Sequence, residues 1–217
     1  MNDETMPPVG FEASDETEIK RSRFLATIAR TDDEASARAL VARLRAEHPT
    51  ARHCCHAHVL DLDGHRIAHS SDDGEPAGTA GIPILNALNG AGLVNATAVV
   101  VRYFGGVKLG AGGLVRAYGG AVASLAGRVP RVVRQHRTVW RLETTHAEAG
   151  RAQEEVMRHG GEIVSTDYEA DGVVLRFTGV GVAGEDPGSF LAPLLRGSGS
   201  IRADGAKEIE VSVEPMS

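Results

Sequence analysis

The sequence predicts a two-domain α+β protein. Strand-like and helix-like patterns alternate along 217 residues, which is enough chain for two separate apolar cores. The composition changes at Pro130, and the last part, about 80 residues, follows the order strand, helix, strand, strand, helix, strand of ferredoxin-like domains. We therefore expect an acidic flexible tail over residues 1–16, an N-terminal domain over 17–130 and a ferredoxin-like domain over 137–217.

The N-terminal domain is expected to open with a strand over residues 18–28. The residues from Thr31 to Glu34 form a capping-box pattern, and the apolar residues behind it recur at helical spacing, so a helix should run to about His48. Residues 54–60 and 66–70 predict two strands joined by an Asp-Gly turn, a strong hairpin signal.

A second helix should start near residues 79–81, with Pro83 in its first turn. Residues 97–103 contain four consecutive apolar residues, as expected of a strand that is covered on both faces. A glycine-rich loop follows, and an apolar stripe from Leu114 to Leu125 predicts a third helix. In the second domain, Thr145 is expected to cap a helix that follows the first strand.

The charge pattern is the most distinctive feature of the chain. The whole sequence has 29 acidic and 23 basic residues, yet residues 76–142 contain no Asp or Glu. The net charge of −6 argues against a general nucleic-acid binder, but the charges are segregated and leave one basic segment. Eight basic residues lie in that segment: Arg102, Lys108, Arg116, Arg128, Arg131, Arg134, Arg137 and Arg141.

The loop RYFGGVKLGAGG within this segment indicates an anion-binding surface. It brings cations and backbone N–H groups to the start of a helix, where phosphates bind well. It matches neither a Walker A loop nor a dinucleotide-binding loop, and its glycines also suit tight turns and close packing. The residues predicted to bind an anion or nucleic acid are Arg102, Lys108, Arg116, Gly105, Gly106, Gly110, Gly112 and Gly113.

An acidic turn, Asp72-Asp73-Gly74-Glu75, borders the basic segment. Crowded carboxylates can bind a hard cation or act as general bases. They can also accept backbone N–H bonds and cap the next helix, or pair with Arg102 or Arg116. We favour the structural roles, because four residues supply too few ligands for a metal site.

The segment from His53 to His58 contains three histidines and two cysteines. On a strand, Cys54, His56 and His58 would share one face, and His53 and Cys55 the other. Ligands at alternate positions spread over roughly 13 Å, too far for one tetrahedral zinc ion, so no metal is expected. The sequence identifies no general base that could activate Cys55, so a buried, inert thiol is favoured. No catalytic residue is identified, and no cofactor is expected.

The location of the protein is predicted to be cytoplasmic. The only two cysteines are adjacent and cannot crosslink distant elements, which fits a reducing compartment. The first residues are acidic and lack an apolar core, unlike a secretory signal. No apolar run approaches the roughly 18 residues of a membrane helix.

Three central segments closely resemble the IMPACT family, in its bacterial YigZ-type members. They are DDGEPAGTAG from Asp72, VVRYFGGVKLG from Val100 and GLVRAY from Gly113. The likeness extends to KRSRF at residues 20–24 and to ARHCCHA at 51–57, in which His53 and Cys55 match a family pattern. His56 and His58 stand where tyrosines are common in the family.

The resemblance implies an N-terminal βαβ domain related to a ribosomal small-subunit protein domain, as in domain IV of the translocation elongation factor G, followed by a ferredoxin-like domain. It also implies a link to translation, because eukaryotic relatives regulate an amino-acid-starvation kinase. Those relatives carry an extra N-terminal domain that is not expected here.

The leading hypothesis is a non-enzymatic regulatory protein of translation that binds RNA or the ribosome through its basic glycine-rich surface. One alternative is a hydrolase that acts on a small anionic substrate, with Asp72, Asp73 and Glu75 as acid, base or metal ligands. Another is a protein-interaction module with a protein partner. No membrane partner is expected.

Overall fold

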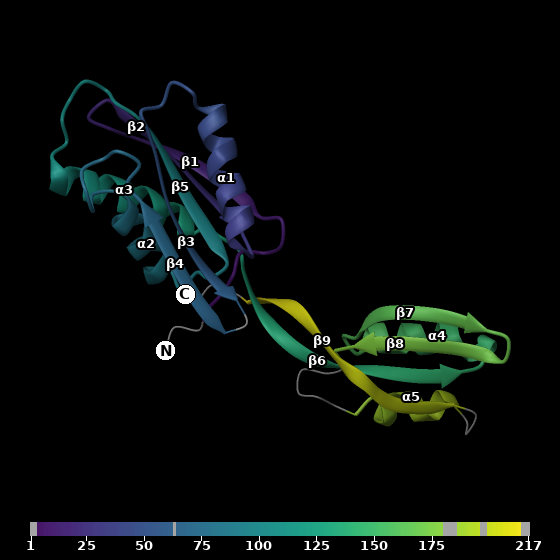
Figure 1. Cartoon of the computed structure of the whole chain (residues 1–217). Coiled ribbons are helices and arrows are strands. Elements are labelled where there is room, and N and C mark those ends of the chain that lie inside the picture. Colours follow the sequence, from purple (N-terminus) through teal and green to yellow (C-terminus); the bar gives the residue numbers. More distant parts are fainter. Residues whose placement is uncertain (1–3, 63, 180–185, 196–198, 214–217) are drawn as a thin grey trace. The chain divides into compact units, whose positions relative to one another are not determined.

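The structure, a computed structural model, describes residues 4–62, 64–179, 186–195 and 199–213. The chain divides into two compact units, Met1–Val133 with Val211–Ser217, and Arg134–Glu210. Each unit has its own sheet and its own apolar core (Figure 1). The predicted two-domain α+β fold is therefore confirmed.

The first unit is a five-stranded sheet between helices. Its order is β1-β2-β5-β3-β4, with β5 in the centre and neighbouring strands antiparallel. Helices α2 and α3 cover one face and α1 covers the other (Figure 1). The elements are β1 (Glu12–Ile19), β2 (Ser22–Arg30), α1 (Glu34–Glu47), β3 (His53–Leu62), β4 (His65–Ser71), α2 (Gly81–Gly90), β5 (Ala96–Tyr103) and α3 (Ala111–Ala126).

Strand β5 is buried on both faces, as its apolar sequence predicts. Val99 and Val101 pack with Leu40 and Leu44 of α1, while the alternate residues Ala98 and Val100 belong to the core under α2 and α3. Because side chains alternate along a strand, Arg102, the next even-numbered residue, also faces α2 and α3. This arginine is central to the candidate site.

The N-terminal residues differ from the predicted flexible tail. Strand β1 pairs with β2 along its whole length, and Met6 is buried and bridges to Val132. The physical reason is alternation: Ala13 and Ile19 pack against the core, while Glu12, Glu16 and Glu18 on the other face of β1 are exposed. Glu12 pairs with Arg43, Glu16 with Arg23, and Asp15 with Arg128.

The second unit contains α4 (His146–Arg158), β7 (Glu162–Glu169), β8 (Gly172–Thr178), α5 (Gly188–Leu195) and most of β6 (Arg131–Thr144) and β9 (Ser200–Val213). This is the predicted βαββαβ order, and the sheet order is β7-β8-β6-β9. Leu142, Leu175 and Phe177 form its core with residues of α4 and α5. No helix among the described residues is long and apolar enough to cross a membrane.

Candidate nucleic-acid interface

Asp72, in the acidic turn between β4 and α2, caps helix α2. Its Oδ1 accepts the backbone N–H groups of Ala80 at 2.9 Å and Gly81 at 2.8 Å, and its Oδ2 accepts that of Gly78 at 2.7 Å. Burial alone would raise the pKa of this carboxyl, but the three N–H bonds outweigh it and hold the pKa below its usual range. The helix has no side-chain cap at Ala80 itself, so Asp72 satisfies the exposed donors.

Asp73 fastens the same turn to α1 and β3. Arg45 donates to its Oδ1 and the Cys54 backbone N–H donates to its Oδ2, each at 2.6 Å. The turn needs left-handed backbone at Asp73 (φ 43°) and at Gly74 (φ 85°), which glycine adopts without strain. Asp72 therefore has the capping role that the sequence favoured, while Asp73 has a structural role with other partners, Arg45 and the backbone of β3.

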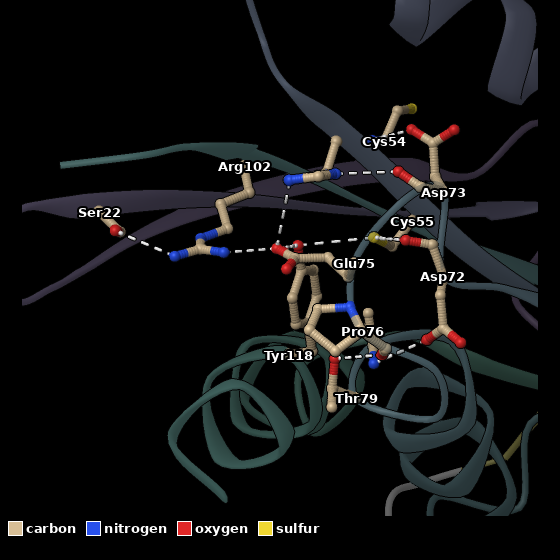
Figure 2. A network of polar contacts seen from close by, with 12 residues as sticks. Ser22, Cys54, Cys55, Asp72, Asp73, Glu75, Pro76, Thr79, Arg102 and Tyr118 are labelled. Carbon is tan, nitrogen blue, oxygen red and sulfur yellow. Dashed lines mark hydrogen bonds and ion pairs between the residues drawn. The ribbon is translucent and has the colours of Figure 1, made fainter. Parts of the chain in front are cut away.

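Glu75 and Arg102 form a buried ion pair at the centre of a polar network (Figure 2). Arg102 Nη1 donates to Glu75 Oε1 at 2.5 Å, and the two side chains are 7% and 4% exposed. The Tyr118 hydroxyl donates to the same oxygen at 2.8 Å, and Arg102 Nη2 lies 3.5 Å from Ser22 Oγ. The sequence predicts Arg102 on the anion-binding surface and also allows it to pair with the acidic turn; the structure shows the pair, with Arg102 buried and its charge balanced by Glu75.

His53 and Cys55 lie on the same face of β3 and complete this network. The Cys55 thiol donates to the backbone oxygen of Asp72 at 2.9 Å, and His53 Nδ1 lies 2.9 Å from that of Asp73. Burial, reinforced by nearby carboxylates, raises the pKa of Cys55 to about 12, and burial also raises the pKa of Tyr118. The thiol thus stays protonated at neutral pH, as expected for an inert cysteine.

The other face of β3 carries Cys54, His56 and His58, as the alternation predicts. Both histidines line a pocket of about 620 Å³ between α1, β3 and β4, together with His69. Burial is the main cause that lowers the pKa of His56 and of His58. In the part of the chain that the structure describes, no group of three His, Cys, Asp or Glu residues is arranged to hold a metal ion.

The loop glycines have mostly structural reasons. A Cβ at Gly105 would lie 2.0 Å from the backbone of Arg21, so only glycine permits this close approach. Gly106 (φ 85°) and Gly110 (φ 72°) adopt left-handed backbone, and a Cβ at Gly113 would press on Leu109 at 2.9 Å. Gly112 has room for a side chain. The packing interpretation therefore accounts for four of the five glycines.

The start of α3 is nevertheless suited to an anion. Gly110, at its N-cap, provides no side-chain cap, and the first turn has no acidic residue, so the positive end of a 16-residue helix is open. Arg116 lies over this turn, with Nη1 3.7 Å from where a Gly112 Cβ would be. Lys108 and Arg116 are exposed, and neither makes an ion pair with any described residue.

A pocket of about 350 Å³ lies beside this helix start. Its lining includes Arg52, Glu75, Arg102, Phe104 and Lys108. Because Glu75 and Arg102 neutralise each other, the net positive charge at the pocket comes from Lys108 and Arg52. The structure thus brings Lys108 and Glu75 to one pocket, while Asp72 and Asp73 are engaged elsewhere.

The sequence-based prediction missed three basic residues of this region. Lys20 (φ 49°) and Arg21 (φ 64°) form the tight turn between β1 and β2, and the backbone of Arg21 touches Gly105. Such turns prefer Asn-Gly, so a Lys-Arg pair gave no turn signal. Arg52 precedes β3, and its guanidinium carbon lies 5.9 Å from the ring centre of Phe104.

Comparison with known proteins supports the resemblance. The sequence profile of the Impact N-terminal domain matches residues 20–126. The chain is 44% identical over 154 residues to the IMPACT family member YigZ of Escherichia coli (strain K12), covering 70% of this chain and 76% of that protein. A crystal structure described only as that of a hypothetical protein is 38% identical with a TM-score of 0.58, covering 94% of this chain and 98% of that one.

A solved structure described as the two-domain translational regulator Yih1 is also similar. It is 25% identical with a TM-score of 0.37, and the match covers 54% of this chain and 48% of that one.

Proposed function

The chain belongs to the IMPACT family, and we propose that it is a non-enzymatic, translation-associated protein whose first unit binds RNA, either free or within the ribosome. The binding surface in this proposal is the glycine-loop surface. We define it as loop residues 104–110, the first turn of α3, and the cations Lys20, Arg21, Arg52, Lys108 and Arg116.

The observation that carries the proposal is the pair of unbalanced cations at the open end of α3. Lys108 and Arg116 have no acidic partner among the described residues, and the surrounding segment supplies none over residues 76–142. An uncapped helix start and two free cations attract phosphate by independent means, through the dipole and through charge. Phosphate contacts of this kind supply most of the affinity of sequence-independent binding.

The acidic N-terminal segment does not cancel this charge. Glu16 pairs with Arg23, and Asp15 pairs with Arg128. Glu12 pairs with Arg43. These acids therefore neutralise other arginines and leave Lys108 and Arg116 available to a partner.

The hydrolase alternative has less support. Glu75 lies in the pocket, but it is paired with Arg102 and accepts a second hydrogen bond from Tyr118. Cys55 is protonated at neutral pH and is a poor nucleophile.

The test is the salt dependence of RNA binding. We would measure the dissociation constant of a fluorescent single-stranded RNA by anisotropy across a salt series. Each lost contact to a single-strand phosphate reduces the log–log slope by about 0.7, so Lys108→Gln with Arg116→Gln should reduce it by about 1.4. Affinity at low salt should fall as well, and so should cosedimentation with ribosomes.

The matched control is Arg151→Gln with Lys207→Gln. It changes the net charge equally at two exposed positions of the second unit. If the two double variants have the same slope and affinity, binding depends on net charge alone, and the glycine-loop surface is not the site.

A further inference from the structure

One exposed aromatic ring stands at the edge of the pocket beside α3. Phe104 is the first residue after β5 and is 42% exposed. An exposed aromatic ring inside a cationic surface is the arrangement by which proteins stack the bases of single strands. Arg102 contacts this ring from the side of the core: its guanidinium carbon lies 5.6 Å from the ring centre of Phe104 and 5.4 Å from that of Phe24.

We propose that this pocket binds one unpaired nucleotide, with its base stacked on Phe104 and its phosphate held by Lys108 and Arg52. The inference rests on the proposed RNA-binding function and adds to it a preference for single strands. In a duplex the bases are stacked on each other, and their faces cannot reach a protein ring.

The dimensions of the pocket favour a single nucleotide. Its volume of about 350 Å³ lies at the low end of the range for small-ligand pockets, about 300–1,000 Å³. Phe104 is the one exposed ring in its lining, since the His53 ring is largely buried in the polar network, so there is room and a ring for one base. Stacking on such a ring tolerates any base, because every base has a π-face.

The polar lining fits a phosphate next to that base. Lys108 and Arg52 line the pocket and have no ion pair among the described residues. The Glu75 carboxylate would repel a phosphate, but Arg102 balances it at 2.5 Å. Arg102 also lines the pocket, so its charge reaches the pocket wall together with that of Glu75.

Arg52 has a second use in this arrangement. It is exposed, and its guanidinium carbon already lies 5.9 Å from the centre of the Phe104 ring. Guanidinium groups stack on bases as well as on aromatic side chains. A base on Phe104 would therefore be covered on its second face by Arg52, which need only swing outward on its flexible chain.

A cycle of two changes tests the stack directly. One change is Phe104→Ala; the other replaces the bases of a short single-stranded RNA by abasic sugars, which keep every phosphate. Phe104→Ala should weaken binding of the normal RNA by about 5- to 150-fold, the range of one base–aromatic stack. It should not affect the abasic RNA, because the two changes remove the same contact. The salt slope should stay unchanged, since no charge is lost.

Two further proteins control for folding and for exposed rings in general. Phe104→Tyr keeps a stacking ring and should bind like the parent protein. Tyr168→Ala removes a ring that is 72% exposed in the second unit and should have no effect. Thermal unfolding of each variant verifies that the fold is kept, which is expected at a half-exposed loop position.

The outcomes separate this inference from the function on which it rests. If the Lys108 and Arg116 variant loses affinity but Phe104→Ala does not, the stack is wrong and the phosphate surface stands. The ring would then be free for a protein partner. If Phe104→Ala weakens duplex and single-stranded RNA equally, the single-strand preference is wrong. If neither variant changes RNA binding, the proposed function fails together with the inference.

Discussion

The two faces of strand β3 treat their buried polar side chains differently. On the face toward α2 and α3, His53 and Cys55 join a network centred on Glu75 and Arg102 (Figure 2). On the face toward α1, His56 Nδ1 and His58 Nε2 are buried without a hydrogen-bond partner among the described residues. Alternation along β3 thus produces a partnered face, with His53 and Cys55, and an unpartnered face, with His56 and His58.

The difference indicates what each face does. Buried polar groups with partners rigidify a core, whereas an unpartnered buried group costs roughly 1–3 kcal/mol of stability. The partnered face lies directly under the glycine-loop surface and fixes the base of its pocket. The unpartnered face, with His56 and His58, does not support the pocket, and we expect its main effect to be on the pH dependence of stability.

The largest effect is expected from breaking the partnered face. Arg102→Met removes the permanently charged partner of the buried Glu75 carboxylate and leaves only Tyr118 and, at 3.9 Å, His53 beside it; loss of one partner of a buried ion pair costs about 3–5 kcal/mol. Urea denaturation at neutral pH measures the free energy of unfolding. The double variant with Glu75→Leu should recover most of the loss, because an apolar pair of similar size replaces the charges.

Arg176→Met provides the contrast on the surface of the second unit. Its guanidinium is 32% exposed and pairs with Asp167 and Asp204. An exposed pair contributes about 0–1 kcal/mol, so this variant should unfold almost like the parent. Equal losses in the Arg102 and Arg176 variants would mean that burial of the Glu75 pair has no energetic consequence.

A moderate, pH-dependent effect is expected from the unpartnered face. The pKa values of His56 and His58 are lowered from 6.5 in the fold, mainly by burial. The unfolded chain therefore binds more protons as the pH falls below about 6.5, and stability declines from there down to the folded pKa values. Each unit by which a pKa is lowered corresponds to about 1.4 kcal/mol.

His56→Gln with His58→Gln should flatten the dependence of the unfolding free energy on pH between 7.5 and 5.5, a window around the ordinary histidine pKa of about 6.5. The control is His65→Gln with His146→Gln, two exposed positions that should leave the slope as it is. A wild-type stability that is constant across this range would contradict the lowered pKa values.

Local patterns in the sequence predicted most elements but few partners of the charges. The alternation of β3, the core strand β5 and the acidic cap of α2 all follow from short-range pattern. Pairing of the acidic turn with Arg102 was among the roles that the sequence favoured, and Glu75 forms that pair. Arg128 instead pairs with Asp15, and Arg134 with Glu208. These partners are distant in sequence and meet only in the folded chain, so local pattern could not identify them.

The smallest expected effect comes from Arg45, which connects the two faces. It donates to Asp73 in the turn and also lines the histidine pocket. Its guanidinium is half-exposed, so Arg45→Gln should cost at most about 1 kcal/mol at neutral pH. It also contributes to lowering the pKa of His56, after the larger effects of burial and His69. Its removal should therefore raise that pKa toward 6.5 and reduce the acid sensitivity slightly, while a Lys at this position should preserve it.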